Sequence, residues 1–230
     1  MRGLFVTATD TGVGKSVLSA ALLAAMRADG IPVAAYKPAL TGTADPPEGD
    51  WPPDDELLAL AADEEPSQVA PLRFPPPVSP HLAAAQAGAE IDPEALVDGA
   101  RRRSPGDGGA LVVEGVGGLL VPLNGRYLVR DLAAALALPL LIAARPGLGT
   151  INHTLLTLAA ARATGLDVRA VVLTPWPTQP SEMERSNRET IAELGEVEVA
   201  TLATLASPRP VELAAAGAAL PWRDWLDRED

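Results

Sequence analysis

A short segment near the N-terminus, Ala8-Thr9-Asp10-Thr11-Gly12-Val13-Gly14-Lys15-Ser16, constrains the fold of this chain more than any other part of its sequence. It follows the apolar run 4–7 and leads into residues 17–23, whose composition is typical of a helix. In a strand, glycine turn and helix of this kind, successive backbone N–H groups converge on one point, and the helix N-terminus adds partial positive charge. The segment therefore predicts a phosphate-binding loop, or P-loop.

The residues of this loop have distinct expected roles. Lys15 is expected to reach the terminal phosphates of a nucleotide, and the Ser16 hydroxyl to contact the accompanying Mg²⁺. The common motif has four residues between its first glycine and Gly-Lys-Ser, whereas Thr9 holds that first position here and the small residue Ala8 lies one place earlier. A serine-capped helix start would explain Gly-Lys-Ser alone, but the preceding strand and the turn glycines favour phosphate binding. The predicted nucleotide contacts in this loop are Gly12, Val13, Gly14, Lys15, Ser16 and Val17.

Apolar runs without alternation recur along the chain and indicate strands that are buried on both faces. These runs are residues 4–6, 31–36, 111–113, 138–144 and 168–173. Between them lie stretches with helical character, at residues 16–29, 93–103, 152–164 and 181–194. The alternation predicts an α/β fold of the P-loop NTPase type, with a doubly wound, mainly parallel sheet and helices on both faces. Its ligands are expected beyond the carboxyl ends of the strands.

The composition narrows the class of function. The 230 residues suit a single domain over 1–230, and the net charge of −12 argues against a nucleic-acid or anionic membrane partner. The absence of cysteine excludes disulfides and thiolate metal sites, and two histidines are too few for a dedicated zinc site. Without a leader pattern or a long apolar run, a soluble cytoplasmic protein is expected. Lys15 and Lys37 are the only lysines, which makes both candidates for function.

Charged residues stand where a buried sheet does not need them. Glu114 ends the run 110–113 and precedes a glycine-rich turn, and Lys37 ends the second predicted strand. Asp54 and Asp55 begin a predicted helix after the loop 43–53, which is expected to lie over the site. Residues 71–80 are predicted to be irregular, up to a helix start at Ser79-Pro80. Ser16, one of the two aspartates and Glu114 would form the all-oxygen shell that Mg²⁺ prefers. Alternatively, Lys37 is an exposed lysine at a strand end, Glu114 is a surface residue, and Asp54 and Asp55 compensate the helix dipole.

Several of these segments together resemble the dethiobiotin synthetase family, and the longer phosphate loop is that family's own variant. The matching blocks follow the family's order through most of the first 155 residues. They are residues 5–16, Tyr36-Lys37-Pro38 with Thr41-Gly42, Ser79-Pro80-His81, Val113-Glu114-Gly115-Val116-Gly117-Gly118 and Leu148-Gly149-Thr150-Ile151-Asn152-His153.

The resemblance implies an ATP- and Mg²⁺-dependent ligase of biotin biosynthesis. Such an enzyme converts 7,8-diaminononanoate and CO₂ into the cyclic urea dethiobiotin, with release of ADP and phosphate. Matched by motif, Lys15, Lys37 and Thr11 would be catalytic, with Thr11, Lys37, Thr41 and Gly117 contacting substrate. Ser16, Asp54 and Glu114 would hold Mg²⁺.

The resemblance also implies a homodimer. The turn Gly149-Thr150-Ile151-Asn152 resembles a segment that crosses a two-fold interface and binds the carboxylate of the diamine in the partner's site. Backbone amides at a helix start suit such a carboxylate.

Some residues depart from the family pattern. Ala8 replaces a glycine, Val116 replaces an alanine, and Asn187 stands where some members carry a substrate-facing tyrosine. Thr174-Pro175 are placed at the nucleotide base but lack the asparagine with which many members read adenine, so the base preference stays open.

Two other classes of protein share parts of the pattern. Partition and cell-division ATPases of the ParA and MinD type act as switches, but they usually carry a second lysine inside the loop. Amidotransferase-linked cobyrinate-type synthetases need a nucleophilic cysteine that this chain lacks. The synthetase reading is therefore preferred.

Overall fold

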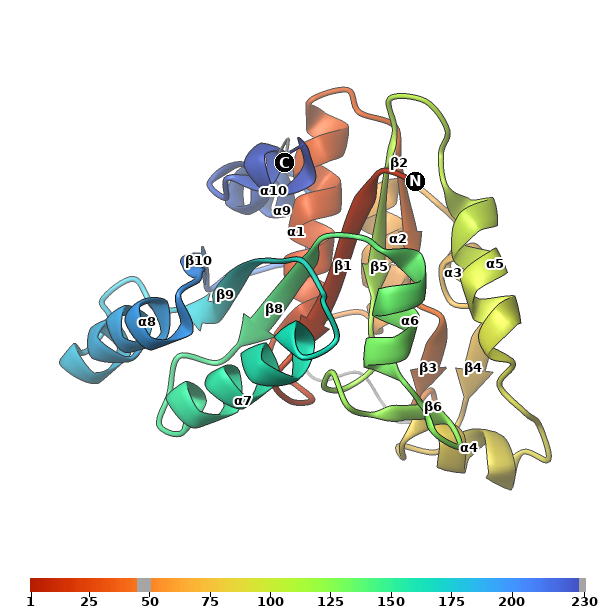
Figure 1. Ribbon diagram of the computed structural model, residues 1–230. Coiled ribbons are helices and arrows are strands. Elements are labelled where there is room, and N and C mark those ends of the chain that lie inside the picture. The colour runs from red at the N-terminus through yellow and green to blue at the C-terminus, as the bar shows by residue number, and fades with distance from the viewer. Residues whose placement is uncertain (45–50, 228–230) are drawn as a thin grey trace.

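The computed structural model describes residues 1–44 and 51–227, and its centre is a six-stranded sheet (Figure 1). All adjacent strands of this sheet are parallel, in the order β10-β9-β8-β1-β5-β2. The strands are β1 (Gly3–Ala8), β2 (Val33–Tyr36), β5 (Ala110–Glu114), β8 (Leu140–Ala144), β9 (Val168–Trp176) and β10 (Glu198–Ala203). Residues 45–50 of the loop expected over the site lie outside the described part of the chain.

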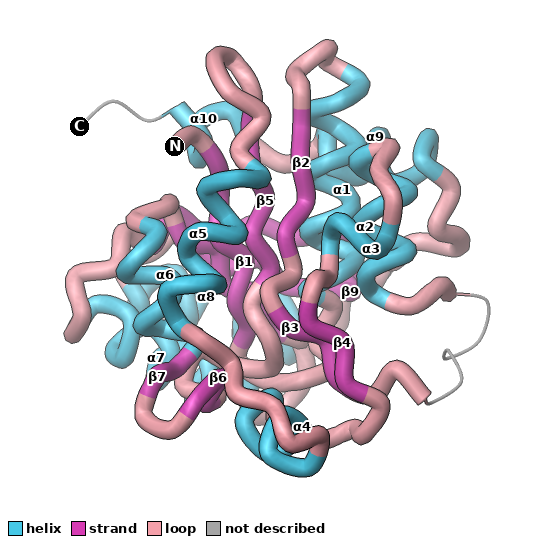
Figure 2. The backbone as a smooth tube through the Cα atoms, turned by 90° about the vertical axis from the view of Figure 1, so that its right-hand side faces the viewer, coloured by secondary structure: helices cyan, strands magenta, loops and turns pink. Residues whose placement is uncertain are grey.

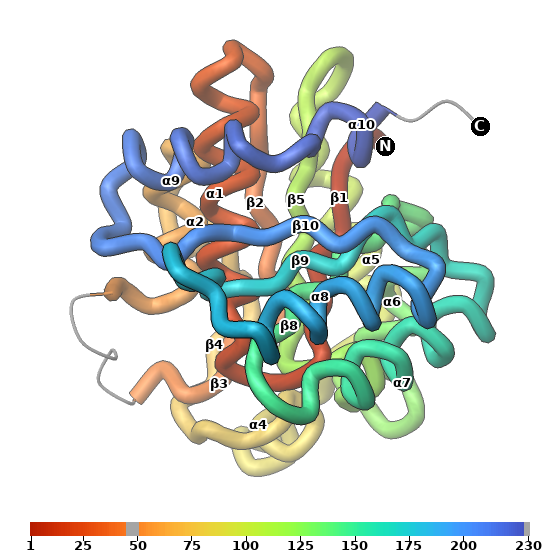
Figure 3. The backbone as a smooth tube through the Cα atoms, turned by 90° about the vertical axis from the view of Figure 1, so that its left-hand side faces the viewer, coloured from red at the N-terminus to blue at the C-terminus, as the bar shows by residue number. Residues whose placement is uncertain are grey.

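Helices cover both faces of the sheet, and two apolar cores form between the layers. Along β1, Leu4 and Val6 enter one core and Phe5 enters the other, because successive side chains of a strand point to opposite faces. Helices α1 (Lys15–Ala28), α2 (Asp54–Ala62), α3 (Pro66–Val69), α9 (Pro210–Ala218) and α10 (Trp222–Asp227) cover the first face. Helices α5 (Pro93–Arg103), α6 (Val129–Leu136), α7 (Thr150–Arg162) and α8 (Glu182–Gly195) cover the second (Figure 3). Helix α4 (Pro80–Gln86) lies beyond the strand ends, against the same core. The predicted fold class is confirmed.

Two small sheets lie at the end of the main sheet where β1, β5 and β2 terminate (Figure 2). Strand β3 (Ala39–Thr41) pairs with β4 (Leu72–Phe74), and β6 (Pro122–Asn124) pairs with β7 (Tyr127–Leu128). The prediction of an irregular segment over 71–80 is wrong for β4, because main-chain pairing with β3 orders it. Over the described ranges, no helix combines the length and apolar character needed to cross a membrane.

Two helices begin earlier than the sequence pattern suggested. Helix α1 starts at Lys15 and α7 at Thr150, each directly behind a glycine in the left-handed conformation, Gly14 with φ 93° and Gly149 with φ 92°. A glycine N-cap adopts this backbone without Cβ strain and has no side chain to occupy the first N–H groups of the helix. Both helix starts therefore present main-chain donors.

Candidate active site

The phosphate loop connects β1 to α1 and is held close to β9 and β8. A Cβ added at Gly14 would lie 2.9 Å from Thr174 Cγ2, so the approach to β9 requires glycine there in addition to its positive φ. On the other side, the Thr9 amide donates to Ala143 O at 3.0 Å, and Asp10 forms an ion pair with Arg145 at 3.1 Å. The predicted base-binding residue Thr174 is thereby placed against the loop.

The two lysines differ in their surroundings. Lys15 Nζ donates to the main-chain oxygen of Asp10 at 3.3 Å, so its side chain folds back over the loop. Burial, with the nearby charge of Lys37, lowers the pKa of Lys15, and Glu114 opposes this shift. The Lys37 ammonium instead contacts two carboxylates, Asp54 Oδ2 at 2.7 Å and Glu114 Oε1 at 2.5 Å.

Ser16, Lys37, Asp54 and Glu114 meet in one group, which we call the strand-end cluster. Lys37 follows β2 and Glu114 ends β5, so their side chains emerge at the same edge of the sheet, and Asp54 comes from the start of α2. The Ser16 hydroxyl donates to Glu114 Oε1 at 2.8 Å. Lys37 and Glu114 are 3% and 0% exposed, which excludes the alternatives of an exposed lysine and a surface glutamate.

The charges of the strand-end cluster stabilise one another. Burial alone would lower the pKa of Lys37, but Asp54 and Glu114 outweigh it and raise that pKa above its ordinary value. Burial would likewise raise the pKa of Asp54, but the Lys37 ammonium and the Ser16 hydroxyl hold it below the ordinary range. Lys37 and Asp54 therefore remain an ion pair at neutral pH.

The donor set of this cluster fits Mg²⁺. It offers a hydroxyl and two carboxylates, and Glu114 Oε2 is buried without a hydrogen-bond partner among residues 1–44 and 51–227. The described chain holds no group of three or more histidine or acidic side chains placed to bind a metal. A small protein donor set suits an ion whose other ligands are phosphates and water.

The structure separates the two adjacent aspartates. Asp55 is fully buried and forms an ion pair with Arg73 of β4, whereas Asp54 faces Lys37. Because successive residues of a helix point about 100° apart, only one of the two can enter the strand-end cluster. Asp54 is that residue.

A cavity of about 640 Å³ opens beside the strand-end cluster. Four of the residues predicted for substrate or metal line it together, namely Thr11, Thr41, Asp54 and Gly117. Val116, the larger replacement in the glycine-rich turn, and Arg73 line it as well.

The segment Gly149–Asn152 lies elsewhere in this chain. None of its residues lines the 640 Å³ cavity of the described chain, and Asn152 is exposed on α7. Asn187 is buried and donates to Pro146 O at 2.9 Å and Gly147 O at 3.3 Å, so it fixes the turn that precedes Gly149.

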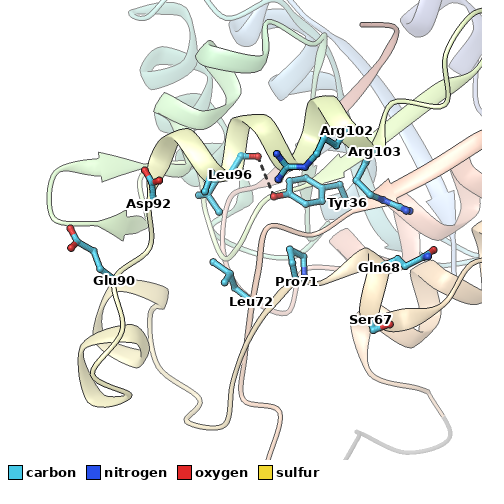
Figure 4. Close-up of a pocket in the computed structure, with 12 residues that line it drawn as sticks. Tyr36, Ser67, Gln68, Pro71, Leu72, Glu90, Asp92, Leu96, Arg102 and Arg103 are labelled. Atoms are coloured by element: carbon cyan, nitrogen blue, oxygen red, sulfur yellow. Dashed lines mark hydrogen bonds between the residues drawn. The ribbon is translucent and has the colours of Figure 1, made fainter.

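A second cavity, of about 500 Å³, lies on the other side of the β2 end and shares no lining residue with the first (Figure 4). The Tyr36 hydroxyl donates to Leu96 O of α5 at 3.1 Å, and Gly99 leaves room for the tyrosine because a Cβ there would overlap its hydroxyl. Burial raises the pKa of Tyr36 to about 12. Tyr36 therefore lines the second cavity, whereas the next residue, Lys37, belongs to the strand-end cluster.

Sequence reasoning missed Arg145 and Arg73. Arg145 directly follows the apolar run of β8, the same signal that pointed to Glu114 and Lys37, and it restrains the phosphate loop through Asp10. Arg73 carried no usable signal, because its strand was read as irregular.

The sheet order and the glycine-bearing loop that begins α1 define a protein of the P-loop nucleotide-binding class. A sequence-family model described as an AAA domain matches residues 2–208. Solved structures agree on this fold. A cell division ATPase MinD of Pyrococcus furiosus matches with TM-score 0.52 at 15% identity, over 94% of this chain and 97% of that one. A ParA family ATPase of Chlorobium tepidum matches with TM-score 0.54 at 12% identity, over 96% and 100%.

Curated relatives narrow the class to one family. An ATP-dependent dethiobiotin synthetase BioD of Anaeromyxobacter sp. (strain K) is 46% identical over 203 residues, 84% of this chain and 89% of the relative. One of Mycobacterium sp. (strain JLS) is 40% identical over 228 residues, 98% of each chain. The chain belongs to the ATP-dependent dethiobiotin synthetase family, and it is an enzyme that uses ATP.

Proposed function

We propose that this chain closes the urea ring of dethiobiotin from 7,8-diaminononanoate, CO₂ and ATP, as a single catalytic domain in the cytoplasm, where ATP is available. The observation that carries the proposal is the strand-end cluster beside the 640 Å³ cavity. It brings a lysine and a hydroxyl-and-carboxylate donor set to the place where the phosphate loop and a substrate would meet.

The chemistry fits what these residues can supply. One amine of the diamine takes up CO₂ as a carbamate, a carbamate oxygen attacks the γ-phosphorus, and the second amine displaces phosphate from the mixed anhydride. In each step negative charge collects on carbamate or phosphate oxygens, and the protons lost by the two amines can pass to water, so positioning and charge stabilisation provide most of the rate. Lys15 and Lys37 are the two cations for that charge, and Thr11 and Thr41 would orient the reactants.

The metal assignment rests on the same residues. Ser16, Asp54 and Glu114 would hold Mg²⁺, which neutralises phosphate charge when bound. The main-chain amides from Gly12 to Val17 would hold the phosphates. Thr174 and Pro175 would border the nucleotide base, and their side chains offer little to distinguish adenine from other bases.

A homodimer is part of the proposal. Leu148 is 89% exposed and Leu156 is 62% exposed, and they flank the exposed Asn152. We call Leu148, Asn152 and Leu156 the α7 face. Large exposed apolar side chains at one helix start support an interface. Through that interface, Gly149, Thr150, Ile151 and Asn152 would bind the carboxylate of the diamine in the partner's cavity.

Phosphate release tests the proposed reaction. It is measured with ATP, CTP or GTP, in Mg²⁺ and bicarbonate, with and without 7,8-diaminononanoate, alongside the urea product. Release that depends on the diamine and equals the urea formed is expected, and the nucleotide ranking reports the base preference. Hydrolysis that is independent of the diamine and yields no urea would contradict the proposal and favour a switch ATPase.

A further inference from the structure

The Lys37 ammonium lies beside the 640 Å³ cavity but does not line it. Its side chain is 3% exposed and is not among those that line the cavity. Its ammonium is instead held by Asp54 Oδ2 at 2.7 Å and Glu114 Oε1 at 2.5 Å. In this position the two carboxylates hold the ammonium away from a carbamate or a γ-phosphate in the cavity.

The oxygens that hold Lys37 belong to the proposed metal ligands. Asp54 and Glu114 supply two of the three protein donors, and the third, Ser16, donates its hydrogen bond to the same Glu114 oxygen that Lys37 contacts. A divalent cation bound by these carboxylates, including through the unpartnered Glu114 Oε2, would lie close to the Lys37 ammonium and repel it strongly, so each cation lowers the occupancy of the other.

We propose that the Lys37 ammonium and the divalent cation compete for Asp54 and Glu114, so that the metal–nucleotide complex releases Lys37 toward the substrate cavity. This inference rests on the metal assignment in the proposed function and extends it. The catalytic charge of Lys37 becomes available only after nucleotide and metal have bound. Lys15 takes no part in the exchange, because its ammonium contacts the main-chain oxygen of Asp10 rather than a carboxylate.

The affinity for Mn²⁺ tests the competition, measured by the loss of the free-ion electron paramagnetic resonance signal in the presence of ADP. Lys37→Met is expected to tighten Mn²⁺ binding by about tenfold, because an internal competitor lowers the apparent affinity in proportion to its occupancy. Arg73→Gln is the control, since it removes an equal charge from the wall of the same cavity, and Arg73 pairs with Asp55 rather than with Asp54 or Glu114. It is expected to change the affinity by less than about threefold. Glu114→Gln should weaken binding.

The movement of Lys37 can be observed directly, because the chain contains only two lysines. Lysine labelled with ¹³C at Cε should give one NMR signal for each side chain, assigned with Lys37→Met and Lys15→Met. ADP alone should shift the Lys15 signal, and addition of Mg²⁺ should then shift and narrow the Lys37 signal as its side chain gains mobility. This readout needs no turnover, and melting curves confirm that each variant is folded.

The possible results separate the two proposals. If Glu114→Gln leaves Mn²⁺ affinity unchanged, or if neither wild type nor Lys37→Met binds Mn²⁺, the metal assignment fails and the competition fails with it. If Glu114→Gln weakens binding while Lys37→Met matches Arg73→Gln, only the competition is wrong. A Lys37 signal that stays fixed when Mg²⁺ joins the ADP complex would also overturn it.

Discussion

The strand-end cluster and the α7 face begin from the same local geometry but have opposite surroundings. Each includes a residue of a helix that starts behind a left-handed glycine, Ser16 of α1 behind Gly14 and Asn152 of α7 behind Gly149. At the cluster, the buried Lys37 contacts carboxylates at 2.5 and 2.7 Å. At the α7 face, Leu148 and Leu156 are mostly exposed. Under the proposed function, the first helix start is completed within one chain, whereas a second chain would complete the other.

The largest expected effect tests whether the strand-end cluster provides catalytic charge. Lys37→Ala should lower kcat by about 10³-fold, because a cation that stabilises charge developing in the transition state would be lost. The affinity for ATP in the absence of divalent metal should change little, since Lys37 does not contact the phosphate loop. Steady-state turnover with the diamine and metal-free calorimetric titration with a non-hydrolysable ATP analogue measure the two quantities. Wild-type turnover by the variant would contradict the catalytic role and leave the cluster a structural feature.

The two glycines allow the comparison itself to be tested. Gly14→Ala should weaken ATP binding by about 10- to 100-fold, since it combines backbone strain of roughly 1–3 kcal/mol with a clash against Thr174. Gly149→Ala is the matched control, because φ is nearly the same and a Cβ there meets no described atom within 4 Å. It should destabilise the protein by strain alone and leave ATP affinity unchanged. Adding Thr174→Ala to Gly14→Ala should restore part of the lost ATP affinity, because it removes the clash. If the affinity is not restored, backbone strain at the positive φ accounts for the whole loss.

A substitution at Asn152 tests whether the α7 face contributes to the partner's site. Asn152→Ala should raise KM for the diamine by about tenfold and leave ATP affinity unchanged, because one polar contact of roughly 1.5 kcal/mol to a charged group is lost. Unchanged KM would remove Asn152 from the substrate site.

Mixed dimers sharpen this test. Lys37→Ala and Asn152→Ala chains are co-expressed with different tags. In a dimer that contains one chain of each variant, one site loses both residues, and the other combines an intact Lys37 with an intact Asn152 from the second chain. With random pairing, the mixture should regain about a quarter of wild-type activity at low diamine. Activity no higher than the average of the two parent variants would show that each site is built within one chain. Sedimentation of Leu156→Glu, which should dissociate the dimer, serves as the interface control.

Much of the fold and of the strand-end cluster could be predicted because buried parallel strands leave a strong pattern. The strands that carry Lys37 and Glu114 read as continuous apolar runs, and parallel topology requires their carboxyl ends to meet at one edge. Strand β10 was not predicted because it lies at the edge of the sheet, and only two of its residues, Val199 and Leu202, are buried. Its apolar run is therefore broken in the sequence.

The choice between Asp54 and Asp55 could not be made from the residues alone. Both begin the same helix, and which one faces Lys37 depends on the rotation of α2. That rotation is set by the burial of the apolar side chains of α2 in the first core, together with the ion pair between buried Asp55 and Arg73, a residue on a strand that exists only through pairing with β3. The position of Lys37 on the metal-ligand oxygens likewise depends on side-chain packing, which no sequence pattern records.

The smallest expected effect is on stability at acid pH. The contribution of the strand-end cluster to the unfolding free energy should depend on pH, whereas that of the α7 face should not. The pKa of Asp54 is lowered in the folded protein, so its contribution to stability is fully present above the unfolded value of about 3.9 and is lost as the pH falls through the folded value. The unfolding free energy of wild type minus that of Asp54→Asn should be constant from pH 7 to about 5 and shrink below about pH 4. Its size should stay under about 1 kcal/mol, because the Asp54 side chain is 44% exposed and water screens the pair.

The same difference for Asn152→Ala should not vary with pH, since no charge is removed from the α7 face. Urea unfolding at each pH measures both, and a difference for Asp54→Asn that grows on acidification would mean that its carboxylate is not stabilised by Lys37.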